Sequence, residues 1–286
     1  PQALLNRAAL DIEAGQADLV LVGGSEAWRT RTSIRQRGAE PDWSHEPDDA
    51  TPTEWFGSDE PMAGPDELAR GVVMPVQFYP IFESAWRAAN GWSVDEHRHR
   101  IGELWARFSE VAATNPNAWI QQAFTPDNRM VGFPYTKRLN SNNAVEQSAA
   151  LLVCSVERAR ALGVPTDRWV FLHAGTDGHD TLFVSNRRDL CSSPAIGIAG
   201  RAALELAGVG PDDVAHVDLY SCFPVAVEVA AHELGLGSGI GSDQPLTVTG
   251  GLSFAGGPWN NYVSHAVATM MERLRDHPGD VGLCSA

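Results

Sequence analysis

Two glycine pairs near the end of the chain surround the stretch best suited to chemistry. The pair at 250–251 follows an apolar run at 246–249 that predicts a short strand, and the pair at 256–257 precedes a predicted helix at 259–274. Glycine permits the tight main-chain turns that such a loop needs. N–H groups of the loop and of the helix start are then expected to lie around one point. This arrangement suits an anion or a developing oxyanion, although an ordinary strand–loop–helix joint shares the pattern.

A tyrosine and a cysteine stand at the ends of two further predicted strands. Tyr220 follows a strand expected at 214–219 and precedes a helix expected at 224–234. Side chains at the carboxyl ends of parallel strands line the crevice where ligands bind, so Tyr220 is a candidate hydrogen-bond donor or acid. A buried tyrosine with a satisfied hydroxyl is the alternative. Cys284 ends a strand expected at 281–284, where a thiol could move a proton if its pKa is lowered, or could simply be buried.

Two other groups of charged or titratable residues are conspicuous. Lys137 is the only lysine and stands beside Arg138, which makes this pair either a phosphate contact or a solvated turn. His97 and His99 lie on a predicted helix that Ser93 opens in a capping-box pattern. Residues two apart on a helix do not face each other, so we expect two solvated histidines and no metal site.

Elsewhere, strands are expected to alternate with helices. A helix at 1–14 precedes a strand at 18–24 whose apolar run is typical of a buried parallel strand, and a strand at 149–155 completes this half. A strand at 169–175 and a helix at 194–207 open the second half. The alternation predicts an α/β fold with a mainly parallel core sheet.

The middle of the chain differs in composition from the two ends. Residues 30–63 are polar, acidic and proline-rich, which predicts an exposed loop, and two helices are expected at 76–89 and 93–114.

Several of these blocks together resemble the thiolase superfamily. Gly-Gly-Leu at 250–252 and Gly-Gly-Pro at 256–258 resemble its Gly-Gly-Leu … Gly-His-Pro block, with Gly257 in place of the histidine. Ala-Gly-Gln-Ala-Asp at 14–18 and Gly-Gly-Ser-Glu at 23–26 also match. Tyr-Ser-Cys-Phe at 220–223 occupies the place of Asn-Glu-Ala-Phe, or of His-Asp-Cys-Phe in the sterol-carrier-protein-like branch.

The resemblance implies a thiolase-like fold of two related α/β halves with an inserted, mostly helical loop domain. The first half is expected at 1–29 and 140–165, the loop domain at 30–139 and the second half at 166–286. The family's nucleophilic cysteine would fall ahead of residue 1, since the first cysteine here is Cys154, so we expect the chain to be part of a longer protein.

The resemblance also implies acyl-CoA substrates, no permanently bound cofactor, no metal and a homodimer, with an additional small domain or subunit as a further possibility. The implied catalytic positions are Tyr220, Cys284 and Gly257, and the implied coenzyme A contacts are Lys137, Arg138, Ser253 and Gly256. Acyl transfer is the activity expected first. Replacement of both oxyanion-hole residues leaves open a retro-aldol carbon–carbon lyase on a CoA thioester, or a non-catalytic CoA- or lipid-binding homologue.

Composition limits the partners. With 286 residues, 43% hydrophobic, the chain can bury a sizeable core. A net charge of −15 argues against nucleic acid or anionic membranes. The four cysteines show no CxxC spacing, and no apolar run reaches the length of a membrane span, so a reducing cytoplasm is expected.

Overall fold

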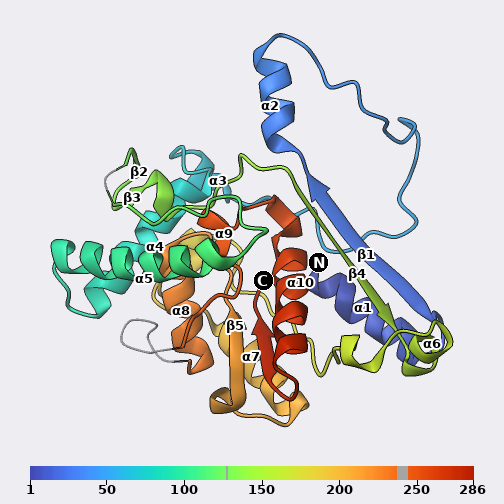
Figure 1. Ribbon diagram of the computed structural model, residues 1–286. Coiled ribbons are helices and arrows are strands. Elements are labelled where there is room, and N and C mark those ends of the chain that lie inside the picture. The colour runs from blue at the N-terminus through green and yellow to red at the C-terminus, as the bar shows by residue number, and fades with distance from the viewer. Residues whose placement is uncertain (127, 237–243) are drawn as a thin grey trace.

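The computed structural model describes residues 1–126, 128–236 and 244–286, and Figure 1 shows their arrangement. Among these residues the strands form three two-stranded sheets, surrounded by helices. None of the described helices combines the length and the apolar composition that crossing a bilayer requires. The short 3₁₀ segments are η1 (Lys137–Leu139), η2 (Thr166–Arg168), η3 (Val184–Asn186), η4 (Pro211–Asp213) and η5 (Trp259–Asn261).

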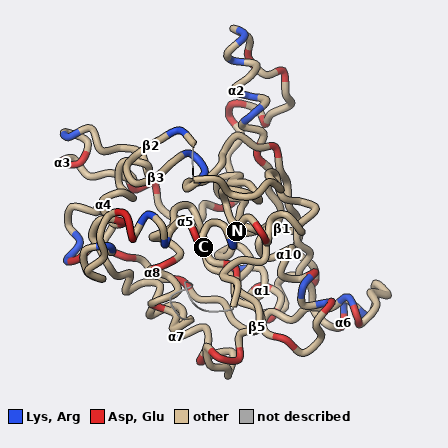
Figure 2. The backbone as a smooth tube through the Cα atoms, turned by 60° about the vertical axis from the view of Figure 1, so that its left-hand side comes forward, with Lys and Arg blue, Asp and Glu red and all other residues tan. Residues whose placement is uncertain are grey.

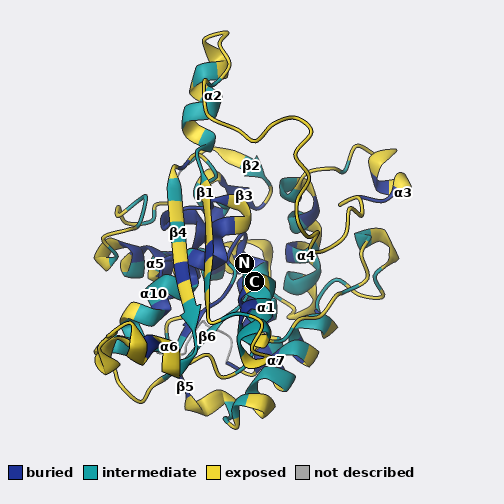
Figure 3. Ribbon diagram, turned by 90° about the vertical axis from the view of Figure 1, so that its right-hand side faces the viewer, coloured by how far each residue is buried: buried dark blue, intermediate teal, exposed yellow. Residues whose placement is uncertain are grey.

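The first sheet joins two segments far apart in the chain. Strand β1 (Leu19–Glu26) pairs antiparallel with β4 (Gln147–Cys154), which leads into α6 (Val156–Ala161). Helix α1 (Gln2–Glu13), predicted from its apolar face, and part of α10 pack against one face of this ribbon. The other face is exposed, as Figure 3 shows, so the expectation of a buried strand of parallel type was wrong.

A helix and a long excursion follow β1. Helix α2 (Trp28–Gln36) extends into the stretch at 30–63 that was expected to be loop, and the guanidinium of Arg31 lies 4.5 Å above the Trp28 ring one turn earlier. The chain beyond α2 is irregular and mostly exposed, as predicted, and its first part stands away from the body of the molecule (Figure 1). It ends at the short helix α3 (Pro65–Leu68).

Both helices predicted in the middle of the chain are present, as α4 (Pro75–Ala89) and α5 (Val94–Thr114). The Ser93 hydroxyl caps α5 by accepting a hydrogen bond from the Glu96 N–H at 3.2 Å. Helix α5 is almost wholly buried on one side and belongs to the same core as the second half of the chain. A small hairpin of β2 (Met130–Gly132) and β3 (Tyr135–Thr136) follows.

One of the two histidines on α5 is not exposed to solvent as expected. His99 is exposed, as expected, but the His97 side chain is only 2% exposed and contacts Glu83 of α4. The solvated interpretation of His97 was therefore wrong. It failed because only the neighbouring histidine was considered as a partner, whereas the actual partner lies 14 residues earlier on another helix.

The second half supplies the parallel sheet. Helix α7 (Pro194–Ala207), strand β5 (Val214–Asp218) and helix α8 (Pro224–Leu234) lie where they were predicted. The chain ends with α9 (Gly251–Phe254), α10 (Tyr262–Asp276) and β6 (Val281–Cys284), and β6 pairs parallel with β5.

Two strands expected in the second half are absent. Residues 169–175 pair with no described strand, and Phe171 and Leu172 on this segment are exposed. Residues 246–249 form bends, because the N–H groups of Val248 and Thr249 donate to the carboxylate of Asp218 and not to a neighbouring strand.

Candidate active site

A buried carboxylate fixes the loop that carries the first glycine pair. Asp218 Oδ2 accepts hydrogen bonds of 2.9–3.1 Å from the hydroxyls of Thr247 and Thr249 and from the N–H groups of Val248 and Thr249. Its Oδ1 accepts from the Tyr262 hydroxyl at 2.8 Å. Desolvation raises the pKa of Asp218. One side chain at the end of β5 thus positions the whole turn.

The glycine pair itself is required by close packing against α5. Gly250 and Gly251 have φ values of +99° and +74°. A Cβ on Gly250 would lie 2.4–2.8 Å from atoms of Ala112, two of them main-chain atoms, and one on Gly251 would lie 2.6 Å from the Phe108 ring. The first part of the motif therefore brings the loop against a core helix.

The second glycine pair packs against the segment that leads into β4. Gly256 has a φ of +114°, and the Gly257 N–H donates to the Asn142 carbonyl at 2.9 Å. A Cβ on Gly257 would lie 2.0 Å from Ser141 Oγ. Histidine at 257, which the family resemblance leads one to expect, would require Ser141 to move.

The Ser253 hydroxyl is engaged within the protein. It accepts from the Trp105 indole N–H and donates to the Asn140 carbonyl, each at 2.9 Å, and the side chain is buried. These bonds tie the loop to α5 and to the segment after η1.

Tyr220 follows β5, as its place in the sequence predicted. Its N–H donates to Ser285 Oγ at 2.9 Å, and its ring packs edge-on against Tyr262, with centroids 5.7 Å apart. Desolvation, followed by the nearby Cys222 thiol, raises its pKa, so the phenol is protonated at neutral pH. Within the described part of the chain, its hydroxyl has no hydrogen-bond partner.

Tyr220 lines a cavity of about 760 Å³. Apolar side chains of α4 and α8, among them Phe78, Phe82 and Val229, form much of the wall. Polar groups come mainly from the segment before α7, where His179, Asp180, Arg187, Ser192 and Ser193 line the cavity. An apolar wall with a few polar groups is typical of a site for a small molecule.

The other six candidate residues lie elsewhere. Seven residues were singled out in the sequence, and Tyr220 alone among them belongs to the described lining of the cavity. No sequence motif pointed to Arg187 or Asp180, because they lie in an irregular stretch before α7. Tyr79, which lines the cavity and stacks on Phe223 at 4.3 Å, was recognised only as part of an apolar helix face.

Two cysteines flank Tyr220 without forming a reactive pair. Desolvation raises the pKa of Cys222 to about 11. Cys284, paired with Asp218 across β5 and β6, has its pKa raised by desolvation and then by the Asp218 charge. Both are thiols at neutral pH and not the thiolates that nucleophilic or proton-shuttling roles require.

Lys137 and Arg138 form part of a basic patch beside the β2–β3 hairpin. Lys137 is exposed, and desolvation followed by the charge of Arg129 lowers its pKa. The Arg138 guanidinium donates to the Ala123 carbonyl at 3.2 Å. Figure 2 shows basic segments next to β2 and β3, on a chain whose net charge is −15.

Comparisons with known proteins agree with this architecture. Residues 176–275 match the family described as thiolase C-terminal domain-like. An acetyl-CoA acetyltransferase of Methanocaldococcus jannaschii is 23% identical over 234 residues, which cover 81% of this chain and 53% of that protein. An acetyl-CoA acetyltransferase of Methanothermobacter thermautotrophicus is 27% identical over 59% of this chain and 48% of its own length. The chain thus spans about half the length of these curated relatives.

Solved structures extend the likeness to nearly the whole chain. A monomeric SCP2-thiolase-like protein type 1 from Mycobacterium smegmatis superposes with a TM-score of 0.79 and 34% identity, covering 99% of this chain and 56% of that one. The Ltp2–ChsH2(DUF35) aldolase superposes with a TM-score of 0.70 over 99% of this chain and 73% of that one, and at 20% identity this likeness concerns the fold. By its glycine loop, its sequence relatives and its fold, the chain belongs to the thiolase superfamily.

Proposed function

We propose that this chain binds acyl-CoA thioesters and cleaves a carbon–carbon bond by a retro-aldol reaction, with Tyr220 as the proton donor. The observation that carries the proposal is Tyr220, which lines the cavity and whose hydroxyl has no hydrogen-bond partner among the described residues. A half-buried phenol without a protein partner is available to a ligand oxygen.

The reaction would begin on a 3-hydroxyacyl-CoA. A base removes the proton of the 3-hydroxyl group, the bond between Cα and Cβ breaks, and an aldehyde or ketone leaves. The electron pair passes to the thioester as an enolate, which the Tyr220 phenol stabilises by donating a hydrogen bond. Tyr220 then gives its proton to Cα, which yields the shortened CoA ester, and the proton held by the base returns to the phenolate. Three described cavity-lining residues could act as the base, namely Glu60, His179 and Asp180.

Acyl transfer, as thiolytic cleavage or Claisen condensation, is the second candidate. The relatives named acetyl-CoA acetyltransferase support it. Against it stands the raised pKa of Cys284, because the proton-shuttling cysteine expected at this position must ionise to act. Retro-aldol cleavage requires no thiolate, and this difference favours the lyase.

The basic patch completes the proposed substrate site. Lys137 and Arg138, with Arg129 beside them, would contact the phosphates of coenzyme A. Residues 30–139 would act as the loop domain between halves at 1–29 with 140–165 and at 166–286. The homodimer and the cytoplasmic location stay predictions.

The test is product analysis with the complete protein and a panel of CoA esters. A 3-hydroxyacyl-CoA that yields a carbonyl compound and a shortened CoA ester without added coenzyme A supports the lyase. Cleavage of a 3-ketoacyl-CoA only with added coenzyme A, together with an acyl group on a cysteine, supports the transferase. Binding without turnover would identify a non-catalytic homologue.

A further inference from the structure

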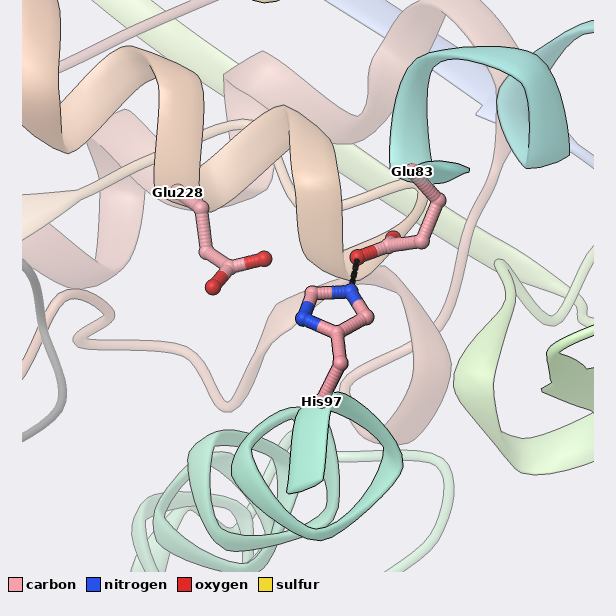
Figure 4. A group of neighbouring side chains, drawn as sticks. All are labelled: Glu83, His97 and Glu228. Atoms are coloured by element: carbon pink, nitrogen blue, oxygen red, sulfur yellow. Dashed lines mark hydrogen bonds and ion pairs between the residues drawn. The ribbon is translucent and has the colours of Figure 1, made fainter. Parts of the chain in front are cut away.

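Three buried titratable side chains meet behind the wall of the cavity. Glu83 of α4, His97 of α5 and Glu228 of α8 are 0%, 2% and 4% exposed, and Figure 4 shows them converging from three helices. Each offers a ligand atom, and these atoms lie within 4.8 Å of one another. Ionisable groups this deeply buried require paired charges or a bound cation.

Glu83 is fully engaged and thereby fixes the imidazole. Its Oε1 lies 2.5 Å from His97 Nε2, and its Oε2 accepts from the Val225 N–H at 3.0 Å and from the Tyr135 hydroxyl. Because a carboxylate accepts, Nε2 carries the ring hydrogen. The other ring nitrogen, Nδ1, is then left with a lone pair directed away from Glu83.

That lone pair faces a second acceptor. Within the described chain, His97 Nδ1 and Glu228 Oε2 are both buried without a hydrogen-bond partner. Figure 4 shows the free ring nitrogen on the side of the Glu228 carboxylate. Two unpaired acceptors in the interior cost stability unless a cation lies between them.

Charge alone does not decide which cation this is. Desolvation, followed by the nearby Glu83 carboxylate, raises the pKa of Glu228, whereas the Arg100 guanidinium, which lies 4.0 Å above the Trp92 ring, acts in the opposite direction. Either a proton or a divalent ion would relieve the repulsion between the two buried carboxyl groups.

The missing hydrogen bond between His97 Nδ1 and Glu228 favours the metal. A shared proton would draw Nδ1 and the carboxylate to hydrogen-bond distance, and no such bond joins them. Ligands of a tetrahedral ion about 2.1 Å from the metal lie roughly 3.4 Å apart.

We propose that His97 Nδ1 and the Glu228 carboxylate bind a divalent metal ion, with Glu83 orienting the imidazole from its other side. A carboxylate–histidine–metal chain of this kind is the usual way in which a ligating histidine is held. One imidazole and carboxylate oxygens suit Zn²⁺ best among the common ions.

The ion would fasten the helices that form the cavity wall. Tyr79 and Phe82 on α4 and Val225 and Val229 on α8 line the cavity, while Glu83 and Glu228 on the same two helices face the cluster. Binding would therefore join α4, α5 and α8 and hold the shape of the substrate cavity.

The experiment uses the tag-free complete protein, stripped with a chelator and then supplied with Zn²⁺. We expect one equivalent to be retained after dialysis, as measured by elemental mass spectrometry. We also expect Tm to rise by about 5 °C or more at a hundredfold excess over Kd. His97→Gln and Glu228→Gln should abolish both effects. His99→Gln is the matched control, because this exposed histidine is two residues away on the same helix.

A measurement on the unaltered protein covers the case in which the buried variants fail to fold. Co²⁺ added to the stripped wild type should give the visible absorption of a low-symmetry nitrogen- and oxygen-ligated ion, and Zn²⁺ should displace it. Absence of retained metal together with an unchanged Tm would show that the cluster holds a proton instead, and would overturn the proposal. Equal metal retention by folded Glu228→Gln would also overturn it.

Discussion

The ring of Tyr220 packs edge-on against the ring of Tyr262, with centroids 5.7 Å apart, and the Tyr262 hydroxyl donates at 2.8 Å to Asp218. Asp218 in turn holds the turn at Thr247 and Thr249. The proposed proton donor is therefore oriented by the same buried network that fixes the glycine loop. The two tyrosines thus differ: Tyr220 lines the cavity, whereas the Tyr262 hydroxyl is hydrogen-bonded within the core.

This division predicts opposite effects for two matched substitutions. Tyr220→Phe should lower turnover by about 10²-fold or more, because losing one such donor costs roughly 2.7–4 kcal/mol of transition-state stabilisation. Its Tm should hardly change, since no residue in the described part of the chain pairs with the hydroxyl. Tyr262→Phe removes a buried hydrogen bond to Asp218 and should cost about 1–3 kcal/mol of folding free energy. Steady-state kinetics and thermal unfolding of both variants make the comparison. Full activity of Tyr220→Phe would remove it from the reaction.

The basic patch should matter for binding and not for folding. Replacing Lys137 and Arg138 by alanine should weaken CoA-ester binding roughly tenfold at low ionic strength, and less at high ionic strength, because salt screens exposed charges. Arg35→Ala with Arg37→Ala, on the exposed helix α2, removes the same charge elsewhere and is the control. Calorimetric titration measures both. Equal affinities for the two double variants would exclude the patch from the site.

Alanine substitutions at Gly250 and Gly57 together test whether the glycine loop packs closely against α5. Their φ values are +99° and +95°, so alanine is strained at either position, by roughly 1–3 kcal/mol. A Cβ at Gly57 meets nothing within 4 Å, whereas one at Gly250 meets main-chain atoms of Ala112. Gly250→Ala should therefore be the less stable variant by at least about 1–3 kcal/mol. Denaturant unfolding provides the comparison, and similar midpoints would contradict the packing described.

The raised pKa values of the two thiols near Tyr220 should make both of them slow to react with an alkylating reagent at neutral pH. Below a thiol's pKa the reactive thiolate is scarce, so Cys222, with a pKa of about 11, and Cys284 should resist iodoacetamide at pH 7.5. Their reactivity should rise with pH toward that range. Peptide mass spectrometry quantifies the labelling, and denatured protein, in which both react, is the reference. Rapid labelling of native Cys284 at neutral pH would instead favour the transferase.

Local sequence signals predicted the elements whose ends are marked by capping residues or glycines. Helix α7 begins where Ser193 caps it and ends at Gly208 in the left-handed conformation, and α8 ends in the same way at Gly235. Side-chain type and spacing determine such boundaries, so they could be placed without tertiary information. Tyr220 was located in the same way, as a residue between a strand and a helix.

Elements that depend on distant partners could not be predicted in this way. The direction of β1 is set by β4, more than a hundred residues later, and the 246–249 segment is shaped by the Asp218 carboxylate. His97 lies on a helix that reads as amphipathic, but its burial depends on Glu83 and Glu228 from two other helices. The cavity likewise joins α4, α8 and the irregular stretch before α7, and no local pattern indicates that these segments meet.

The most direct test of the proposed reaction is the fate of a 3-hydroxyacyl-CoA incubated with the complete protein in the absence of free coenzyme A. Liquid chromatography with mass spectrometry should detect a shortened CoA ester and an equimolar aldehyde or ketone, formed about 10²-fold more slowly by Tyr220→Phe. An unchanged 3-hydroxyacyl-CoA, alongside 3-ketoacyl-CoA cleavage that needs free coenzyme A and leaves an acyl group on a cysteine, would contradict the retro-aldol assignment.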